Sequence, residues 1–137
     1  MRAELGAQRG GPLWLAREAW PEPLPTSYSA LLERDDAHLV VGCLDDAPVG
    51  FGAVLVETLT TGARLGVVTD LFVEEPAREV GVGEALLDAL VQFCSTAGCS
   101  SMDARALPGN RAAKNFFETH GFTARALVVH RELPRTR

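Results

Sequence analysis

An arginine and two glycines, in the pattern Arg78-x-x-Gly81-x-Gly83, stand between a predicted strand and a predicted helix. The first turn of a helix has unpaired N–H groups and a partial positive charge, so it is a natural site for phosphate. Glycines let the backbone approach a pyrophosphate without a Cβ in the way, and Arg78 adds a charge-assisted contact. The pattern predicts a pyrophosphate-binding loop at residues 78–83. The same glycines are also compatible with a tight turn that binds nothing.

Other phosphate-binding loops fit this segment poorly. A P-loop needs Gly-Lys followed by Ser or Thr, which the sequence lacks. A dinucleotide-binding fingerprint requires a third small residue where Leu86 stands. Asp103 follows about twenty residues on, where the ribose-binding acid of that fingerprint would be. The antiparallel strands predicted upstream are nevertheless the wrong context for it.

The segments around the loop predict one mixed sheet. Strand-like runs joined by short turns, at 38–44, 49–58 and 65–73, predict an antiparallel meander. Apolar residues at helical spacing then predict a helix over 84–97 that packs one face on the sheet. A fourth strand at 101–107 must return beside the third, and the crossover helix makes that pair parallel.

The two ends of the chain are predicted to frame this sheet. The N-terminal region, residues 1–36, is expected to be helical, with one helix over 12–20 and a second capped by Thr26 or Ser27. Its tryptophans are interpreted as core packing or as a lid over a pocket. Towards the C-terminus, Asn110 is expected to cap a helix through Thr119, and 122–133 is the last extended segment. We interpret the chain, 1–137, as a single domain.

Composition narrows the classes of function. Hydrophobic residues make up 47% and charged residues 23% of the 137 residues, which is typical of a soluble globular domain. The formal net charge of −5 argues against binding nucleic acid or an anionic membrane and is compatible with an amine-bearing substrate. The three cysteines form no paired framework, and no metal is expected. With no apolar run of membrane-spanning length and no leader, we expect a cytoplasmic protein.

Two blocks of the sequence together resemble the GNAT superfamily of N-acetyltransferases. The first runs from Leu71-Phe72-Val73 through Pro76 and the arginine-glycine loop to Leu86-Leu87, and is similar to the signature for coenzyme A. The second is Asn110-x-x-Ala113-x-x-Phe116-Phe117-Glu118-x-x-Gly121-Phe122. With the predicted order of strands, the resemblance covers residues 38–133, and it implies that 37–133 is a CoA-binding core.

The resemblance implies a GNAT-like α/β (mixed α+β) fold and a set of site residues. The antiparallel meander would continue into a parallel, splayed strand pair, with helices on both faces of the sheet. Acetyl-CoA would bind as cosubstrate in the splay, with the pantetheine arm along the third strand and the pyrophosphate on the loop. The residues implied to bind it are Leu71, Phe72, Val73, Arg78, Glu79, Val80, Gly81, Val82, Gly83, Asn110 and Phe117.

Asp70 is the candidate catalytic residue. In the implied reaction an acceptor amine attacks the thioester directly, and backbone amides of the third strand polarise the carbonyl. The amine must be neutral, so a general base is needed. Asp70 stands where similar proteins often carry a carboxylate, and an apolar cleft would raise its pKa. It could equally only orient a substrate ammonium or face solvent; Glu74 is a weaker candidate.

Two features depart from the family pattern. Similar proteins often have a tyrosine as general acid for the thiolate where this chain has Phe117, which has no proton to donate. They also open with a strand that is missing here, because no alternating apolar run precedes residue 12. The strand at 38–44 would then be an unpaired edge, from which we predict a homodimer.

Three hypotheses follow. The leading one is an acetyl-CoA-dependent N-acetyltransferase acting on an amine of a small molecule or peptide. The alternative is a non-catalytic, acyl-CoA-binding GNAT-like sensor or regulatory module, which Phe117 and the missing strand both favour. The third is a small α/β protein that uses its glycines only as turns. Turnover separates the first two, and CoA binding separates both from the third.

Overall fold

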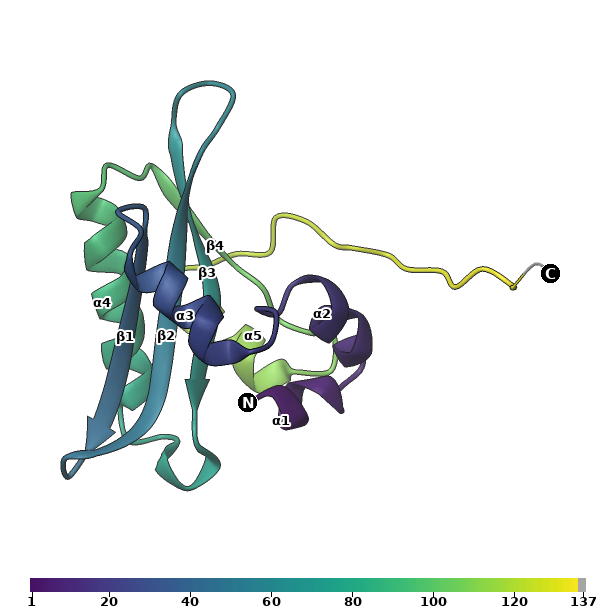
Figure 1. Ribbon diagram of the computed structural model, residues 1–137, viewed down its shortest axis with the longest axis horizontal. Coiled ribbons are helices and arrows are strands. Elements are labelled where there is room, and N and C mark those ends of the chain that lie inside the picture. Colours follow the sequence, from purple (N-terminus) through teal and green to yellow (C-terminus); the bar gives the residue numbers. More distant parts are fainter. Residues whose placement is uncertain (136–137) are drawn as a thin grey trace.

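A mixed four-stranded sheet organises the protein, as the computed structural model shows for residues 1–135 (Figure 1). Residues 136 and 137, the end of the predicted domain, lie outside the described part. The strands are β1 (Ala37–Leu44), β2 (Ala47–Thr58), β3 (Arg64–Val73) and β4 (Ser101–Ala104), in that spatial order. The first three pair antiparallel, and β4 runs parallel to β3. The predicted α/β class and the meander are confirmed.

Helix α4 (Val82–Thr96) covers one face of the sheet. Its buried stripe includes Leu90 and Cys94, which pack on Val54 of β2 and Val68 of β3. Gly66 of β3 permits this packing, because a Cβ there would lie 2.4 Å from the Cys94 sulfur. The helix begins two residues earlier than the pattern predicts, directly after the loop.

The N-terminal region forms three short helices, α1 (Arg2–Gly6), α2 (Gly11–Arg17) and α3 (Leu24–Leu32). Helix α3 covers the other face of the sheet, where Leu31 joins Ala37 and Ala53 in a second buried cluster. Its start differs from the predicted cap at Thr26 or Ser27. Prolines are tolerated at the start of a helix, where their missing N–H is not needed, so α3 begins within the proline-rich stretch.

The C-terminal part differs more from the prediction. Strand β4 ends at Ala104, three residues before the predicted end, and α5 (Arg111–Thr119) follows with the predicted Asn110 cap. The segment 122–133 forms no ladder with the sheet in the part of the chain that the structure describes. Figure 1 shows it projecting away from the body.

Strand β1 lies at the edge of the sheet, as the missing first strand predicts. Among residues 1–135 no strand precedes it, and only β2 pairs with it. Helices therefore lie on both faces of a sheet whose two outer strands each lack one neighbour. No helix within the described residues has the length and apolarity that crossing a membrane would need.

Candidate active site

A β-bulge on β3 decides where Asp70 points. Ala53 of β2 is opposite Asp70, but the next residue, Val54, is opposite Val68, so Thr69 is an extra residue on β3. Val68 faces the α4 side with Val54, whereas Ala53 belongs to the cluster beneath α3. Strict alternation would put residues 68 and 70 on the same face. The extra residue turns the Asp70 side chain towards the N-terminal helices instead.

The Asp70 carboxylate is buried, with 4% of the residue exposed. The indole N–H of Trp20 donates to Oδ2 at 2.8 Å, and the Thr69 hydroxyl lies 3.3 Å from the same oxygen. Burial raises the pKa of Asp70, while the hydrogen bonds from Trp20 and Thr69 act in the opposite direction. A carboxylate with a raised pKa is better matched to accepting a proton near neutral pH.

Tyr28 of α3 belongs to the same environment. Burial, and next the charge of Asp70, raise the pKa of Tyr28 to about 12, and Arg2 opposes this shift. Its ring packs edge-on against Phe51, with 5.9 Å between centroids. The Arg2 guanidinium also donates to the Trp20 carbonyl at 2.9 Å. The N-terminal helices therefore supply the wall around Asp70, a role that the sequence analysis did not assign to Tyr28 or Arg2.

The loop from residue 78 to 83 has the backbone that an anion site requires. After a 3-10 turn, η1 (Glu75–Ala77), the chain takes left-handed φ values at Glu79 (68°) and Gly81 (89°). Gly81 caps α4, and no atom lies within 4 Å of the position that its Cβ would take. Within the described residues, the amides of residues 79–83 donate to no protein group. Unpaired amides beside a helix N-terminus favour an anion.

Arg78 folds back onto the end of β3. Its Nε donates to the Val73 carbonyl at 2.8 Å, and its guanidinium lies 5.3 Å from the centre of the Phe72 ring. Its Nη2 donates to both carboxylate oxygens of Glu4 in α1 at 3.0 Å. The hydrogen bond from Arg78 is the main reason that the pKa of Glu4 is lowered. The loop is therefore attached both to β3 and to α1.

Beyond the end of the β3–β4 ladder, β3 has an unpaired edge that includes Asp70 and leads to this loop. The parallel ladder ends at the pair Val68–Ala104, so the stretch Thr69–Val73 has no partner on that side within the described residues. The predicted pantetheine-binding residues Leu71, Phe72 and Val73 are all in this stretch. The structure thus places Asp70, the free edge of β3 and the loop along one strand end.

The remaining predicted residues lie on α5. The Asn110 side chain accepts a hydrogen bond from the Ala113 amide at 3.0 Å, so it serves as a helix cap. Phe117 is 9% exposed and packs against Phe122, with ring centroids 5.3 Å apart. A neighbouring aromatic, Phe116, contacts the place where Gly83 lacks a side chain, at 3.5 Å from the ideal Cβ. Val80 is exposed and Val82 buried in the loop.

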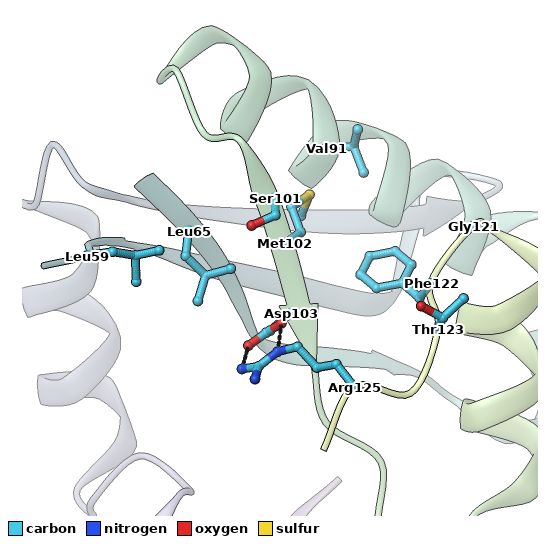
Figure 2. A pocket seen from close by; sticks show the side chains of 10 residues that line it. All are labelled: Leu59, Leu65, Val91, Ser101, Met102, Asp103, Gly121, Phe122, Thr123 and Arg125. Carbon is cyan, nitrogen blue, oxygen red and sulfur yellow. Dashed lines mark hydrogen bonds and ion pairs between the residues drawn. The ribbon is translucent and has the colours of Figure 1, made fainter. Parts of the chain in front are cut away.

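Two open grooves lie at the outer edges of the sheet, away from Asp70. One, of about 620 Å³, runs beside β4 and includes Leu65, Met102 and Phe122 (Figure 2). The other, of about 320 Å³, lies between β1 and the start of α4. Neither includes Asp70.

Comparison with solved structures shows the same fold. A structure of AAC(6')-Iy in complex with the bisubstrate analogue CoA-S-monomethyl-acetylneamine has a TM-score of 0.72 at 16% identity, over 89% of this chain and 87% of that one. A transcriptional regulator from Bacillus halodurans C-125 has a TM-score of 0.71 at 21% identity, over 97% and 91%. The aminoglycoside acetyltransferase meta-AAC0020 from an uncultured soil metagenomic sample, in complex with sisomicin, has a TM-score of 0.68 at 21% identity, over 93% and 83%.

Comparison of sequences gives the family. No curated protein sequence matches the chain. The model of the acetyltransferase (GNAT) family matches residues 11–122, which include the whole sheet, the loop and α5. The chain therefore belongs to the GNAT acetyltransferase family.

Proposed function

We propose that this protein transfers an acetyl group from acetyl-CoA to an amine of a small molecule or peptide. The observation that carries the proposal is that a buried carboxylate and an amide-rich loop lie at the same end of one strand, β3. Buried Asp70 lies on β3, and the amide-rich loop is attached to the same strand through Arg78 and Val73. A base and an anion-binding loop so placed suit a reaction between an amine and a phosphate-bearing acyl donor.

The loop fits the pyrophosphate of CoA. The amides of residues 79–83 are free of protein partners in the described chain, and nothing fills the space beside Gly81. The Glu4 carboxylate, an anion, already accepts hydrogen bonds from Arg78. Arg78 and the amides would thus hold the phosphates, and Leu71 to Val73 would pair with the pantetheine amides. When bound, acetyl-CoA supplies the thioester carbonyl that an amine can attack.

Asp70 would take the proton that the attacking amine must lose. Its raised pKa keeps it a weak acid, and its burial excludes water that would compete. Trp20 donates to one carboxylate oxygen and so orients the other for the acceptor. Amides on the unpaired side of β3 would stabilise the negative charge on the carbonyl oxygen.

The acceptor is proposed to be a cationic, amine-bearing compound. AAC(6')-Iy and meta-AAC0020 are aminoglycoside acetyltransferases, so this fold can acetylate amines of small molecules. The net charge of −5 is compatible with attracting a cation. Peptide amines are the other class to be tested.

One observation favours the alternative of a non-catalytic, acyl-CoA-binding sensor. Phe117 occupies the position where relatives often have a proton-donating tyrosine, and it is buried against Phe122. In that case the protein would bind acetyl-CoA without turnover. A thiolate is a good leaving group, so the absence of a tyrosine at this position does not by itself exclude catalysis.

A screen for thiol release tests the proposal. Acetyl-CoA is incubated with panels of aminoglycosides, polyamines and peptides, and free thiol is measured, while calorimetry measures CoA binding separately. Release that depends on both an amine and Asp70 supports the enzyme. Binding without release for any amine supports the sensor. Absence of CoA binding contradicts both.

A further inference from the structure

Two cysteines lie at the end of α4, one on each side of the turn that closes the helix. Cys94 is in the last helical turn, and Cys99 follows Gly98, whose left-handed φ of 81° ends the helix. The Cys99 amide donates to the Cys94 carbonyl at 2.9 Å, and the Gly98 amide donates to the Ser95 carbonyl at 3.1 Å. These two hydrogen bonds define a Schellman motif, in which the side chains at the positions of Cys94 and Cys99 pack together.

The surroundings of the two thiols agree with this motif. Cys94 is 1% exposed and belongs to the core cluster with Val54 and Val68. Half-buried Cys99 packs against the same cluster. The Cys94 sulfur lies directly over Gly66 of β3, where a Cβ would be 2.4 Å away. The motif therefore places a partly exposed thiol beside a fully buried one.

The two thiols differ in how they can react. Burial, next the charge of Cys99 and then a hydrogen bond between the two thiols raise the pKa of Cys94 to about 12. The thiolate is the nucleophile in thiol–disulfide exchange, and access to the sulfur is also required. A dissolved disulfide therefore cannot react first at Cys94, whereas it can reach Cys99.

We propose that Cys94 and Cys99 form a modification site that reacts with low-molecular-weight disulfides, such as oxidised glutathione, and closes into a disulfide. The Cys99 thiolate attacks one sulfur of oxidised glutathione, forms a mixed disulfide and releases one glutathione thiolate. Cys94 then loses its proton to solvent and attacks the Cys99 sulfur, which releases the second glutathione. Two protein thiols are thus oxidised while one glutathione disulfide is reduced to two thiols.

The second step is favoured because it occurs within one motif. A group that is already held beside its target reacts as if it were at a very high concentration. Further contacts hold the same corner, since the Arg64 guanidinium donates to the Ala97 carbonyl at 2.7 Å and the Ser100 amide donates to the Arg64 carbonyl at 2.9 Å. These contacts keep Cys99 close to Cys94 when the mixed disulfide has formed.

Cys43 provides a control in the same molecule. It is exposed and lies on β1, in the groove beside Val82 at the start of α4, whereas Cys94 and Cys99 are at the end of that helix. Figure 1 shows the β1–β2 turn and the α4–β4 connection at opposite ends of the sheet. Because neither of the other cysteines is near it, Cys43 should keep the glutathione with which it reacts.

Mass spectrometry on the full chain tests the site. The protein is brought to equilibrium with oxidised glutathione at a fixed concentration of reduced glutathione, and the remaining thiols are then alkylated. The peptides with Cys94 and Cys99 should lose two hydrogens and retain no glutathione. Half-conversion should need about tenfold less oxidised glutathione, or lower still, than half-modification of Cys43. Excess reduced glutathione should restore both thiols.

Two variants show whether the position of the thiol matters. Cys99→Ser removes the reachable thiol, so buried Cys94 should stay unmodified. The combined change Cys99→Ser and Ser100→Cys keeps the composition but moves the thiol to an exposed position, where it should retain glutathione as Cys43 does. Glutathione retained on wild-type Cys99 at equilibrium overturns the proposal. So does a disulfide that joins two chains, or one that forms as readily after the thiol is moved.

Discussion

The Asp70 side chain combines two opposing influences on its charge. Burial under the N-terminal helices disfavours the carboxylate, whereas the Trp20 and Thr69 hydrogen bonds stabilise it. Burial is the larger of the two, and the pKa is raised. For a buried acid this means that the folded state holds its proton more tightly than the unfolded chain. Burial therefore both makes the Asp70 carboxylate a better proton acceptor and lowers the stability of the folded state when Asp70 is ionised.

Asp70→Asn separates base strength from shape. We expect kcat to fall about 10²-fold, as is usual when a general base is lost, while acetyl-CoA affinity is kept. An acid with a raised folded pKa contributes stability that is fully present below its unfolded pKa, about 3.9, and is lost as pH rises through the folded pKa. The variant should thus melt higher than wild type at neutral pH but not near pH 3. An unchanged pH–rate profile would assign the base to another group.

Phe117→Tyr tests whether this residue lies at the site. The ring is buried against Phe116 and Phe122, so we expect the added hydroxyl to lack a partner and to cost roughly 1–3 kcal/mol of stability, with no gain in turnover. Thermal unfolding and thiol release measure the two effects on one sample. Unchanged stability with faster release would instead place the hydroxyl in an open cleft near the thiolate.

At the scale of elements, the loop joins three parts of the fold. The loop leads directly into the first turn of α4. Arg78 donates hydrogen bonds to the Val73 carbonyl at the end of β3 and to Glu4 of α1. Phe116 of α5 packs over Gly83. A ligand that binds to the loop would therefore also alter its contacts with α1 and α5.

Gly83→Val tests the cradle. Its Cβ would meet Phe116 at 3.5 Å, an ordinary contact, so the branched methyl groups would have to occupy the space near the free amides. We expect acetyl-CoA affinity to fall by about 2 kcal/mol or more, roughly thirtyfold. Gly109→Val is the matched control, because only the Arg9 Cβ lies near its ideal Cβ, at 3.9 Å. Calorimetry showing wild-type affinity for Gly83→Val would contradict the cradle.

Glu4→Gln tests whether α1 competes with a phosphate for Arg78. The half-exposed ion pair is worth about 0.2–1 kcal/mol, so releasing the arginine should tighten CoA binding up to about fivefold. The gain should shrink at high salt, which screens such pairs. Glu22→Gln, which removes the ion pair with Arg2 instead, is the control. Weaker binding in Glu4→Gln would show that the helix supports the loop and does not compete.

At the scale of the whole molecule, the candidate site depends on contacts between distant parts of the chain. Trp20 and Asp70 are fifty residues apart in sequence, and Glu4 and Arg78 are seventy-four apart. Glu4 lies in α1 and Trp20 between α2 and α3, so both contacts come from the N-terminal region, whose helix α3 lies across the sheet from α4. The N-terminal region that covers Asp70 is thus distinct from α4 and the sheet face beneath it, which form the main core.

Trp20→Phe tests that long-range contact. The ring is kept but the N–H donor to Asp70 is lost, so the pKa of Asp70 should rise further. The acid limb of kcat/KM should move to higher pH by about one unit, the scale of a hydrogen bond to a charged group. Trp14→Phe changes a half-buried tryptophan of α2 and should leave the limb in place. If both profiles match wild type, Asp70 is not the titrating base.

Local patterns in the sequence were sufficient to predict the four strands, the helices α4 and α5, and the loop between β3 and α4. Each depends on the spacing of apolar residues, on a cap such as Asn110, or on a glycine, and these act over a few residues. The unpaired edge at β1 also followed, from the lack of an earlier strand-like run. The site residues predicted in the loop and on β3 occupy neighbouring positions in the fold for the same reason.

The environment of those residues was decided only by tertiary structure. The extra residue at Thr69 changes which face Asp70 occupies, and a bulge depends on pairing with β2, not on the sequence of β3 alone. The partners Trp20 and Glu4 are brought to the site by the folding of the N-terminal region, whose helix α3 packs on the sheet. The same holds for the groove at β4, because it exists only where a short strand leaves its neighbour's surface uncovered. Spacing along a chain specifies local conformation, whereas contacts across many residues require the register and packing of the whole sheet.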